Sequence, residues 1–486
     1  MIKNEKGGIE RVRFLTKEGM QKIHDQSLLL LQNTGISVDH EEALKMLGDA
    51  GADVDMKTQV VKIPPDLVEK CLPKVPRKMT LAGRNPERDL VLEPAGKVRT
   101  RNCGGMTQIY VSETGEIRDA VLADTADVAR LIDGLDDIDY VGPLYPSDVP
   151  LETLELQTLE TMLNNTDKNI NIRALTRRNL PYLVKMAEVV AGGKDKLRER
   201  PVISLLEAPI APLRFPDVFV EALYLAGEYN IPVEICSMPN LGATGPITVA
   251  GCLLLSNAEQ LATIVVSQLA HPGTPVVWAS RFPMMDMASG ASGMYAEAAL
   301  VNAASAQMAT EQYNLICSLH GPATNSIVPD GRSVLDECIG AFVTGFVGRP
   351  SVLTGAGGLE IGLIASHEEM VISNEILGVV RRMIDGFEVD DDTLGYDAIT
   401  RVGIGGNFLE DDHTFKYLRA KKFNPTFVKP QTKVSWREGG SKLMVQTARE
   451  KADAILRDHR PAPLDKDVAA GLKEVVKEAR KNFGMD

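Results

Sequence analysis

The alternation of short apolar runs with segments of helical length is the feature that most constrains how this chain folds. Its clearest instance is Ser351–Gly358, an apolar run that ends in glycines. This run lies between two apolar segments of helical length, Val334–Val347 and His367–Ile384. Short apolar runs that alternate with helical patterns indicate βαβ units and a parallel sheet. The same alternation recurs towards the N-terminus.

Eight such runs are strand candidates, and each is followed by enough residues for one helix and short loops. Eight parallel strands, each followed by a helix, predict an α/β fold of the (β/α)₈ TIM-barrel type. An open doubly wound sheet is the alternative that periodicity alone does not exclude. The eight candidates are Val98–Cys103, Ile138–Gly142, Asn169–Arg173, Val202–Glu207, Pro232–Ser237, Pro275–Ser280, Leu315–His320 and Ser351–Gly358.

The strand candidates divide the chain into three parts. Residues 1–97 are expected to form an N-terminal cap region of helices and short strands, and residues 98–385 the barrel. Residues 386–486 are expected to form a C-terminal helical extension packed on the barrel or on a neighbouring subunit. An acidic run, Asp390–Asp392, is interpreted as a solvated helix start, because it lacks the turn glycine of a calcium loop.

Charge and cysteine usage limit the classes of protein. A net charge of −13 argues against a general binder of nucleic acid or acidic lipid. No uncharged apolar stretch reaches 18 residues, so no membrane span is expected. The six cysteines are spread singly and contain no CxxC pair, which is typical of free thiols. We therefore expect a cytoplasmic protein.

Barrel enzymes build their active sites at the carboxyl ends of the strands. Glu207 ends the fourth strand candidate and His320 the seventh, and both are candidate catalytic residues. The ordinary alternatives are that Glu207 pairs with a neighbouring arginine and that His320 is a structural, hydrogen-bonded histidine. The other candidate site residues near strand ends or loops are Tyr145, Arg173, Trp278, Arg281, Phe282 and Tyr295.

Other common catalytic patterns are missing from the sequence. No metal-ligand spacing, Walker loop or Gly-x-Ser-x-Gly elbow occurs, so no metal is expected. Gly355, Gly357 and Gly358 are a candidate cofactor-binding run, although such a short glycine run is a weak signal. A Schiff-base lysine of a lyase or aldolase is also not indicated, since no strand candidate ends in lysine.

Several motifs, spread in order along most of the chain, resemble those of the trimethylamine methyltransferase family. The most specific are Asn240–Gly251, which reads Asn-Leu-Gly-Ala-Thr-Gly-Pro-Ile-Thr-Val-Ala-Gly, and Asn257–Ala262. Further matching segments are Leu81–Pro86, Ala129–Asp133, Met285–Met287, Gly355–Gly357, Asn374-Glu375, Glu388–Asp391, Thr393-Leu394, Gly405-Gly406 and Phe408-Leu409.

This resemblance implies a (β/α)₈ barrel and a methyl transfer from an amine to the Co(I) corrinoid of a separate protein. No corrinoid is expected to stay bound to the chain itself. Founding members of the family carry pyrrolysine near the seventh βα loop, whereas residues 321–330 here are all standard amino acids. The chain thus resembles the non-pyrrolysine branch, whose members demethylate glycine betaine, proline betaine, carnitine or γ-butyrobetaine. A homo-oligomer is also expected.

For such a substrate the candidate residues acquire roles. Aromatic faces bind quaternary ammonium groups, so Tyr145, Trp278, Phe282 and Tyr295 are candidates for that end of the substrate. Arg281, Arg173 and His320 are candidates for a substrate carboxylate, since arginine can bind it with two hydrogen bonds. Glu207 is expected to face the ammonium.

The sequence departs from the family pattern at two places, and the function keeps two alternatives. Asn407 replaces the usual histidine of a Gly-Gly-His-Phe-Leu motif, and Arg281 follows the sixth strand where a small or neutral residue is usual. The alternatives are a non-catalytic betaine-binding or sensor barrel, and a trimethylamine-type methyltransferase without pyrrolysine.

Overall fold

A parallel barrel forms the centre of the molecule. The computed structural model describes residues 12–418 and 425–485. Seven parallel strands pair in the order β6-β17-β16-β13-β12-β10-β9. They are β6 (Arg99–Asn102), β9 (Ile170–Ile172), β10 (Ile203–Glu207), β12 (Val233–Ser237), β13 (Val276–Ser280), β16 (Cys317–His320) and β17 (Val352–Ala356).

The second predicted strand, Ile138–Gly142, closes the barrel between β6 and β9 but forms only isolated bridges. Tyr140 pairs with Arg101 of β6, and Val141 pairs with Ile170 of β9. The Thr100 amide donates to the Asp139 carboxylate at 2.8 Å, so a side chain here replaces the backbone carbonyl that a regular strand would offer. The (β/α)₈ barrel is therefore confirmed, with one irregular strand.

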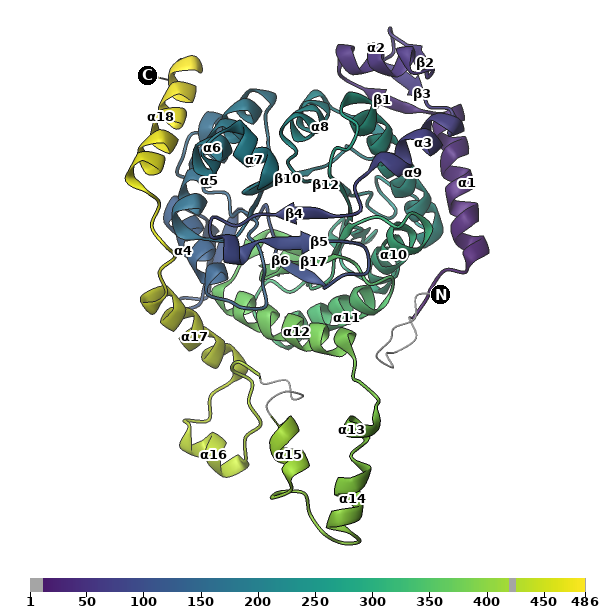
Figure 1. Cartoon of the computed structure of the whole chain (residues 1–486). Coiled ribbons are helices and arrows are strands. Elements are labelled where there is room, and N and C mark those ends of the chain that lie inside the picture. The colour runs from purple at the N-terminus through teal and green to yellow at the C-terminus, as the bar shows by residue number, and fades with distance from the viewer. Residues whose placement is uncertain (1–11, 419–424, 486) are drawn as a thin grey trace.

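Helices surround the strands in chain order, as Figure 1 shows. The largest is α9 (Val249–Ala270), whose length and apolar composition would suffice for a membrane span, although most of it is buried inside the protein. The other barrel helices are α4 (Leu122–Asp133), α5 (Leu154–Asn165), α6 (Leu180–Ala191), α7 (Lys194–Glu199), α8 (Asp217–Tyr229), α10 (Ala296–Gln307), α11 (Gly331–Phe346) and α12 (His367–Asp385).

The hairpin of β4 (Met79–Leu81) and β5 (Leu90–Leu92) lies across the amino ends of the barrel strands (Figure 1). Its apolar side chains form one buried cluster with Val277, Ile316 and Val352 from the start of three strands. This end of the barrel is thus closed by apolar packing. A ligand site is left to the opposite, carboxyl end of the strands.

The rest of the N-terminal region packs on the outside of the barrel, mainly on α9. It contains a small sheet in which β1 also pairs with β11 (Arg214–Phe215) from the loop after β10. Its elements are α1 (Lys17–Asn33), β1 (Ile36–Val38), α2 (Glu41–Asp49), β2 (Asp53–Asp55), β3 (Val60–Lys62) and α3 (Pro65–Cys71).

Short strand pairs edge the carboxyl end. After the first barrel strand, β7 (Gln108–Val111) and β8 (Glu116–Asp119) form a hairpin. It joins β18 (Gly358–Leu359) and β19 (Ile364–Ala365) in one small sheet. After β13, the pair β14 (Met284–Met285) and β15 (Ser292–Gly293) forms a second hairpin.

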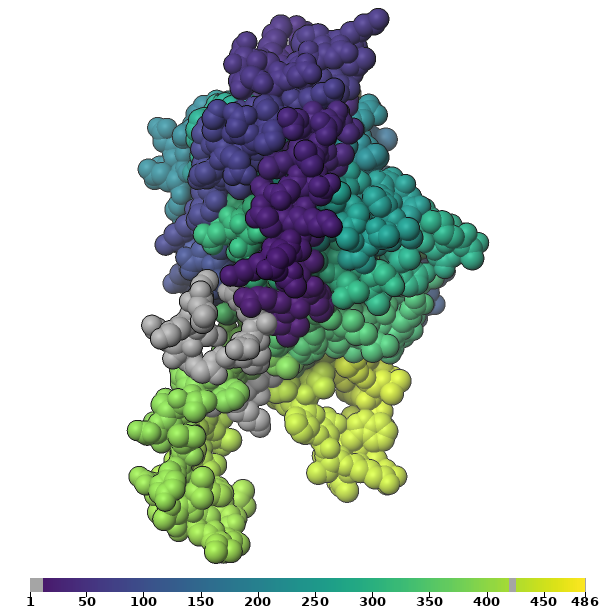
Figure 2. Space-filling model, turned by 90° about the vertical axis from the view of Figure 1, so that its right-hand side faces the viewer, coloured from purple at the N-terminus to yellow at the C-terminus, as the bar shows by residue number. Residues whose placement is uncertain are grey.

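The C-terminal part divides into packed and projecting segments. Helix α17 (Met444–Asp458) packs on α12 and α4, and α18 (Lys466–Asn482) packs on α6 and α5. Figures 1 and 2 show that the segments before α17 extend away from the body. They carry α13 (Asp391–Leu394), α14 (Tyr396–Val402), α15 (Asp412–Tyr417) and α16 (Lys433–Glu438).

Candidate functional site

A charged cluster spans the barrel interior above the apolar floor. Arg101 of β6 reaches across to Glu234 of β12, with 3.5 Å between Nη2 and Oε2. The Tyr140 hydroxyl donates to Glu234 Oε1 at 2.5 Å, and the Ser318 hydroxyl donates to Oε2 at 3.0 Å. Both charged side chains are almost fully buried, at 1% and 3% exposure. Burial of a charged pair is tolerated when it is hydrogen-bonded in this way.

Glu207, at the end of β10, lies beside Arg173 and Tyr145. Its Oε1 accepts the Ala174 amide at 3.0 Å, and the Tyr145 hydroxyl donates to the Arg173 carbonyl at 3.1 Å. Burial raises the pKa of Glu207 to about 8, and the neighbouring Arg173 opposes this only in part. The carboxyl group is therefore mostly protonated at pH 7 when no ligand is bound.

His320, at the end of β16, is buried and uncharged. Burial lowers its pKa well below the ordinary value, and the guanidinium groups of Arg281 and Arg101 lower it further. A Cβ on Gly355 would lie 2.6 Å from His320 Nε2, so only glycine allows β17 to pass this close to the ring. A neutral imidazole can form hydrogen bonds here but cannot supply a proton at neutral pH.

The carboxyl end of the barrel brings three guanidinium groups together. Arg101, Arg173 and Arg281 all lie close enough to Cys236, at the end of β12, to influence its thiol. Five buried nitrogens in this region have no hydrogen-bond partner among the described residues. They are Nε and Nη1 of Arg101, Nε of Arg173, Nη2 of Arg281, and Nδ1 of the His320 imidazole.

Unpaired buried donors and excess positive charge make this a region that would hold an anion. A wall of small or apolar side chains lies next to it, at the ends of β10, β12 and β13. Ala208, Cys236 and Ala279 form one buried cluster, with Leu206 packed against it. The arrangement thus combines an anion-binding set with an adjacent apolar surface.

The predicted aromatic residues are not brought together as a cage. Trp278 points outward from β13, donates its indole N–H to Ser305 of α10 at 3.1 Å and packs on Tyr313. Phe282 is fully buried in the main hydrophobic core. Tyr295 is 42% exposed on the loop before α10. Because alternate residues of a strand face opposite sides, Trp278 faces the helices and not the barrel interior. This position does not fit the cation-binding role that we expected for it.

The predicted glycine run is explained by packing inside the chain. The Cβ positions of Gly357 and Gly358 would collide with Met370 and Cys103, and the Gly357 amide donates to the Ser373 hydroxyl at 2.9 Å. The run therefore does not form an open cradle for a corrinoid. Contact between this glycine run and a corrinoid held by another protein stays a prediction.

Arg101, Glu234 and Tyr140 were not predicted as site residues, because they lie inside the strand candidates and not at their ends. A signal was present: Glu234 interrupts the apolar run Pro-Val-Glu-Ile-Cys, and a charge inside a buried strand needs a partner. Arg101 sits in the first strand candidate in the same way.

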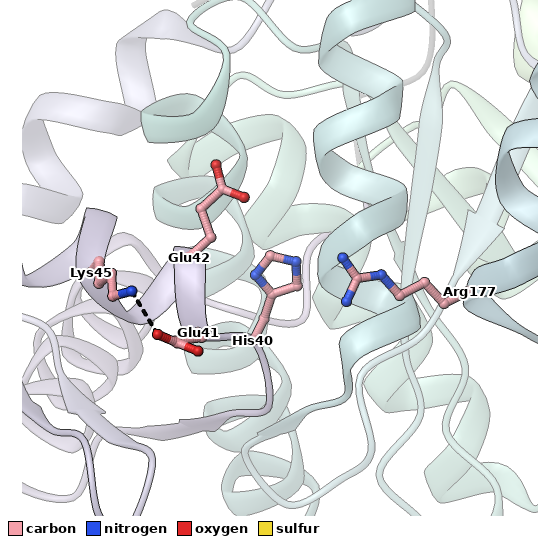
Figure 3. A pocket seen from close by; sticks show the side chains of 5 residues that line it. All are labelled: His40, Glu41, Glu42, Lys45 and Arg177. Atoms are coloured by element: carbon pink, nitrogen blue, oxygen red, sulfur yellow. Dashed lines mark hydrogen bonds and ion pairs between the residues drawn. The ribbon is translucent and has the colours of Figure 1, made fainter.

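The hollow of about 350 Å³ shown in Figure 3 lies away from these strand ends. It is lined by α2 and by Arg177 from the loop after β9. His40 and Arg177 both contact Glu221, and Lys45 pairs with Glu41. Its basic groups are thus paired with carboxylates, and within the part of the chain that the structure describes this hollow lacks the unpaired donors of the barrel cluster.

The chain was compared with known proteins. The model of the trimethylamine methyltransferase (MTTB) family matches residues 1–484. A trimethylamine methyltransferase MttB from Desulfitobacterium hafniense (strain DSM 10664 / DCB-2) is 36% identical over 471 residues, which cover 96% of this chain and 94% of that protein. A trimethylamine methyltransferase MttB from Methanosarcina barkeri (strain Fusaro / DSM 804) is 31% identical, with coverage of 99% and 97%.

A glycine betaine methyltransferase from Desulfitobacterium hafniense (strain Y51) is 30% identical over 482 residues, which cover 98% of this chain and 99% of that protein. These relatives span the whole barrel and both flanking regions. The match of the family model over almost every residue agrees with the motifs found in the sequence. The chain belongs to the trimethylamine methyltransferase family and is a methyltransferase.

Proposed function

We propose that this protein transfers a methyl group from a quaternary amine of the betaine type to the Co(I) of a corrinoid carried by a partner protein. The observation that carries the proposal is the set of unpaired buried donors on Arg101, Arg173, Arg281 and His320. An amine without an anionic group would leave these donors unused. The glycine betaine methyltransferase among the relatives supports the same substrate class.

The chemistry of a quaternary amine suits this site. The corrinoid would supply a Co(I) nucleophile whose electron pair goes to the methyl carbon. The C–N electron pair stays on nitrogen, and the amine departs neutral, so no proton is needed. His320, with its lowered pKa, is then suited to hold and orient the substrate by a hydrogen bond.

Glu207 is the group that we assign to the ammonium end. Its carboxyl group is buried beside the small apolar wall, and a cation next to it would favour its ionised form. Attraction to a fixed carboxylate would compensate for the missing aromatic cage. We further infer that Arg173 and Arg281, which are only partly buried, line the outer part of the site.

We also infer a homo-oligomer, in agreement with the sequence-based expectation. The projecting segment 387–418 exposes many large apolar side chains, and its helices are too short to be stable alone in water. A second copy of the chain would cover them. The exposed residues include Leu394, Tyr396, Ile399, Ile404, Leu409 and Phe415. A cytoplasmic location is part of the same proposal.

The test is anaerobic methyl transfer to cob(I)alamin or to a corrinoid protein, followed by visible spectroscopy. The substrates are glycine betaine, proline betaine, carnitine, γ-butyrobetaine and trimethylamine. Methylation of the corrinoid by one betaine is the expected result. Activity with trimethylamine alone would favour the trimethylamine-type alternative, and binding of a betaine without turnover would favour the sensor alternative.

A further inference from the structure

Arg101 is more than the counter-ion of Glu234. The two oxygens of Glu234 already accept the hydroxyl groups of Tyr140 and Ser318 at 2.5 and 3.0 Å, whereas Arg101 approaches only to 3.5 Å. An arginine kept only to neutralise a buried carboxylate is expected to form the short, two-bonded pair that its geometry favours. The carboxylate is held by the hydroxyl groups, and the guanidinium remains available.

Two of the three nitrogens of this guanidinium group, Nε and Nη1, have no partner among residues 12–418 and 425–485. Leaving a buried charged donor without a partner is costly, and such groups in native proteins usually await a ligand or a water molecule. The side chain is only 1% exposed, so bulk solvent does not satisfy these donors.

The surroundings of Arg101 also leave space for this group. A Cβ on Gly104 or Gly142 would lie 2.8 or 2.7 Å from its Nη1, so glycine at both positions admits the guanidinium to the level of the strand ends. Arg101 lies close enough to His320 to affect its imidazole. The unpaired donors of Arg101 and of His320 therefore belong to one region.

We propose that the barrel contains a carboxylate-binding site centred on Arg101, with Glu234, Tyr140 and Ser318 as the groups that hold the guanidinium in place. His320 Nδ1, in the tautomer that carries its proton there, completes the site from β16, two strands along the sheet from β6. Ligands of this site are small molecules with a carboxylate. Among the three arginines, Arg101 would contribute most to binding, since it is the one that water screens least.

This site deepens the proposed function and rests on it for the orientation of the substrate. The carboxylate would lie at the buried guanidinium, and the trimethylammonium group would lie nearer the mouth, beside Glu207. The methyl group would then face the side from which a corrinoid of another protein approaches. The opposite orientation would place the methyl group against the closed, apolar end of the barrel.

The test compares binding of three probes to the full-length protein by isothermal titration calorimetry. Glycine betaine carries both groups, 3,3-dimethylbutyrate has the same shape but no positive charge, and choline has no carboxylate. Loss of charge-assisted hydrogen bonds in Arg101→Gln is expected to weaken binding of the first two by roughly 10- to 100-fold and to leave choline unchanged. Turnover of glycine betaine should show a matching rise in KM.

Two further variants separate binding from stability. Arg101→Gln/Glu234→Gln removes both charges and so avoids an unpaired buried carboxylate, and it should show the same losses. Arg84→Gln removes a half-buried arginine, which pairs with Asp167 at 2.8 Å at the opposite end of the barrel, and it should bind as the wild type does.

The outcomes distinguish this inference from the proposed function. Unchanged affinity for 3,3-dimethylbutyrate and glycine betaine in folded Arg101→Gln would overturn the site, even if methyl transfer from a betaine were established. Loss of 3,3-dimethylbutyrate binding in this variant would support the site, even if the methyl donor were a different carboxylate-bearing amine. Equal losses in Arg84→Gln would also overturn it.

Discussion

Glu207→Gln should make the protein more stable at alkaline pH. The Glu207 carboxyl group is 2% exposed, and burial raises its pKa from 4.5 to about 8. Between these two pH values the folded protein holds a proton that the unfolded chain has released. The free energy of unfolding therefore falls as pH rises, by up to about 1.4 kcal/mol for each pH unit.

The size of the effect follows from the same two values. Above pH 8 the buried carboxylate destabilises the folded protein by about 5 kcal/mol relative to a neutral group at this position. Glutamine has nearly the same shape and can still accept the Ala174 amide. The difference in stability between variant and wild type should thus be small near pH 4.5 and should grow until about pH 8.

Urea denaturation at a series of pH values from 5 to 9 measures this difference, with Glu116→Gln on the exposed strand β8 as the control for loss of a carboxylate. Parallel pH profiles of Glu207→Gln and the wild type would refute the reasoning. A bound betaine should ionise Glu207, so calorimetry at pH 7 in buffers of different ionisation enthalpy should detect release of up to about one proton. Glu207→Gln should release none.

Three other outcomes are expected. Trp278→Phe loses one buried hydrogen bond to Ser305 and should lower stability by about 1–2 kcal/mol, while KM for the methyl donor, measured by initial rates, stays unchanged; a raised KM would return Trp278 to the site. Lys168→Met should lower stability by about 3 kcal/mol or more in urea denaturation, because three backbone carbonyls that Lys168 Nζ binds at 2.5–2.7 Å lose their donor. Ile404→Asp together with Leu409→Asp should dissociate the oligomer in light scattering, and a monomeric wild type would contradict the inferred interface.

The barrel could be predicted because each strand is both apolar and sharply bounded. Proline or glycine stands beside several strand boundaries, for example Pro275 before β13 and Gly321 after β16. The segment 138–142 looked like the other strands, but one of its ladder hydrogen bonds is replaced, since the Thr100 amide donates to the Asp139 side chain. Side-chain replacement of a ladder hydrogen bond leaves no trace in apolar periodicity. The three-part division of the chain stays a prediction.

The candidate site was partly predictable for a related reason. The carboxyl ends of parallel strands meet at one end of a barrel, and this alone brings Arg173, Glu207 and His320 to the same region. The error at Trp278 came from ignoring the two-residue period: its neighbours Val277 and Ala279 join interior clusters, so Trp278 faces the helices. The pairing of Arg101 with Glu234 depends on strands opposite each other in the barrel, which a single sequence does not reveal.

We expect the charges of the assembled site to favour one of the two substrate classes named among the relatives. Three guanidinium groups lie near the carboxyl groups of Glu234 and Glu207, with the buried Glu155 close enough to raise the pKa of Glu207, and Glu207 is mostly protonated at pH 7 until a cation arrives. Trimethylammonium would add a positive charge to a region that already has an excess, at a cost that grows as water is excluded. A betaine carries its own anion, which would occupy the unpaired donors of Arg101 while its ammonium would ionise Glu207. We therefore propose that the barrel cluster favours a zwitterion over a bare cation.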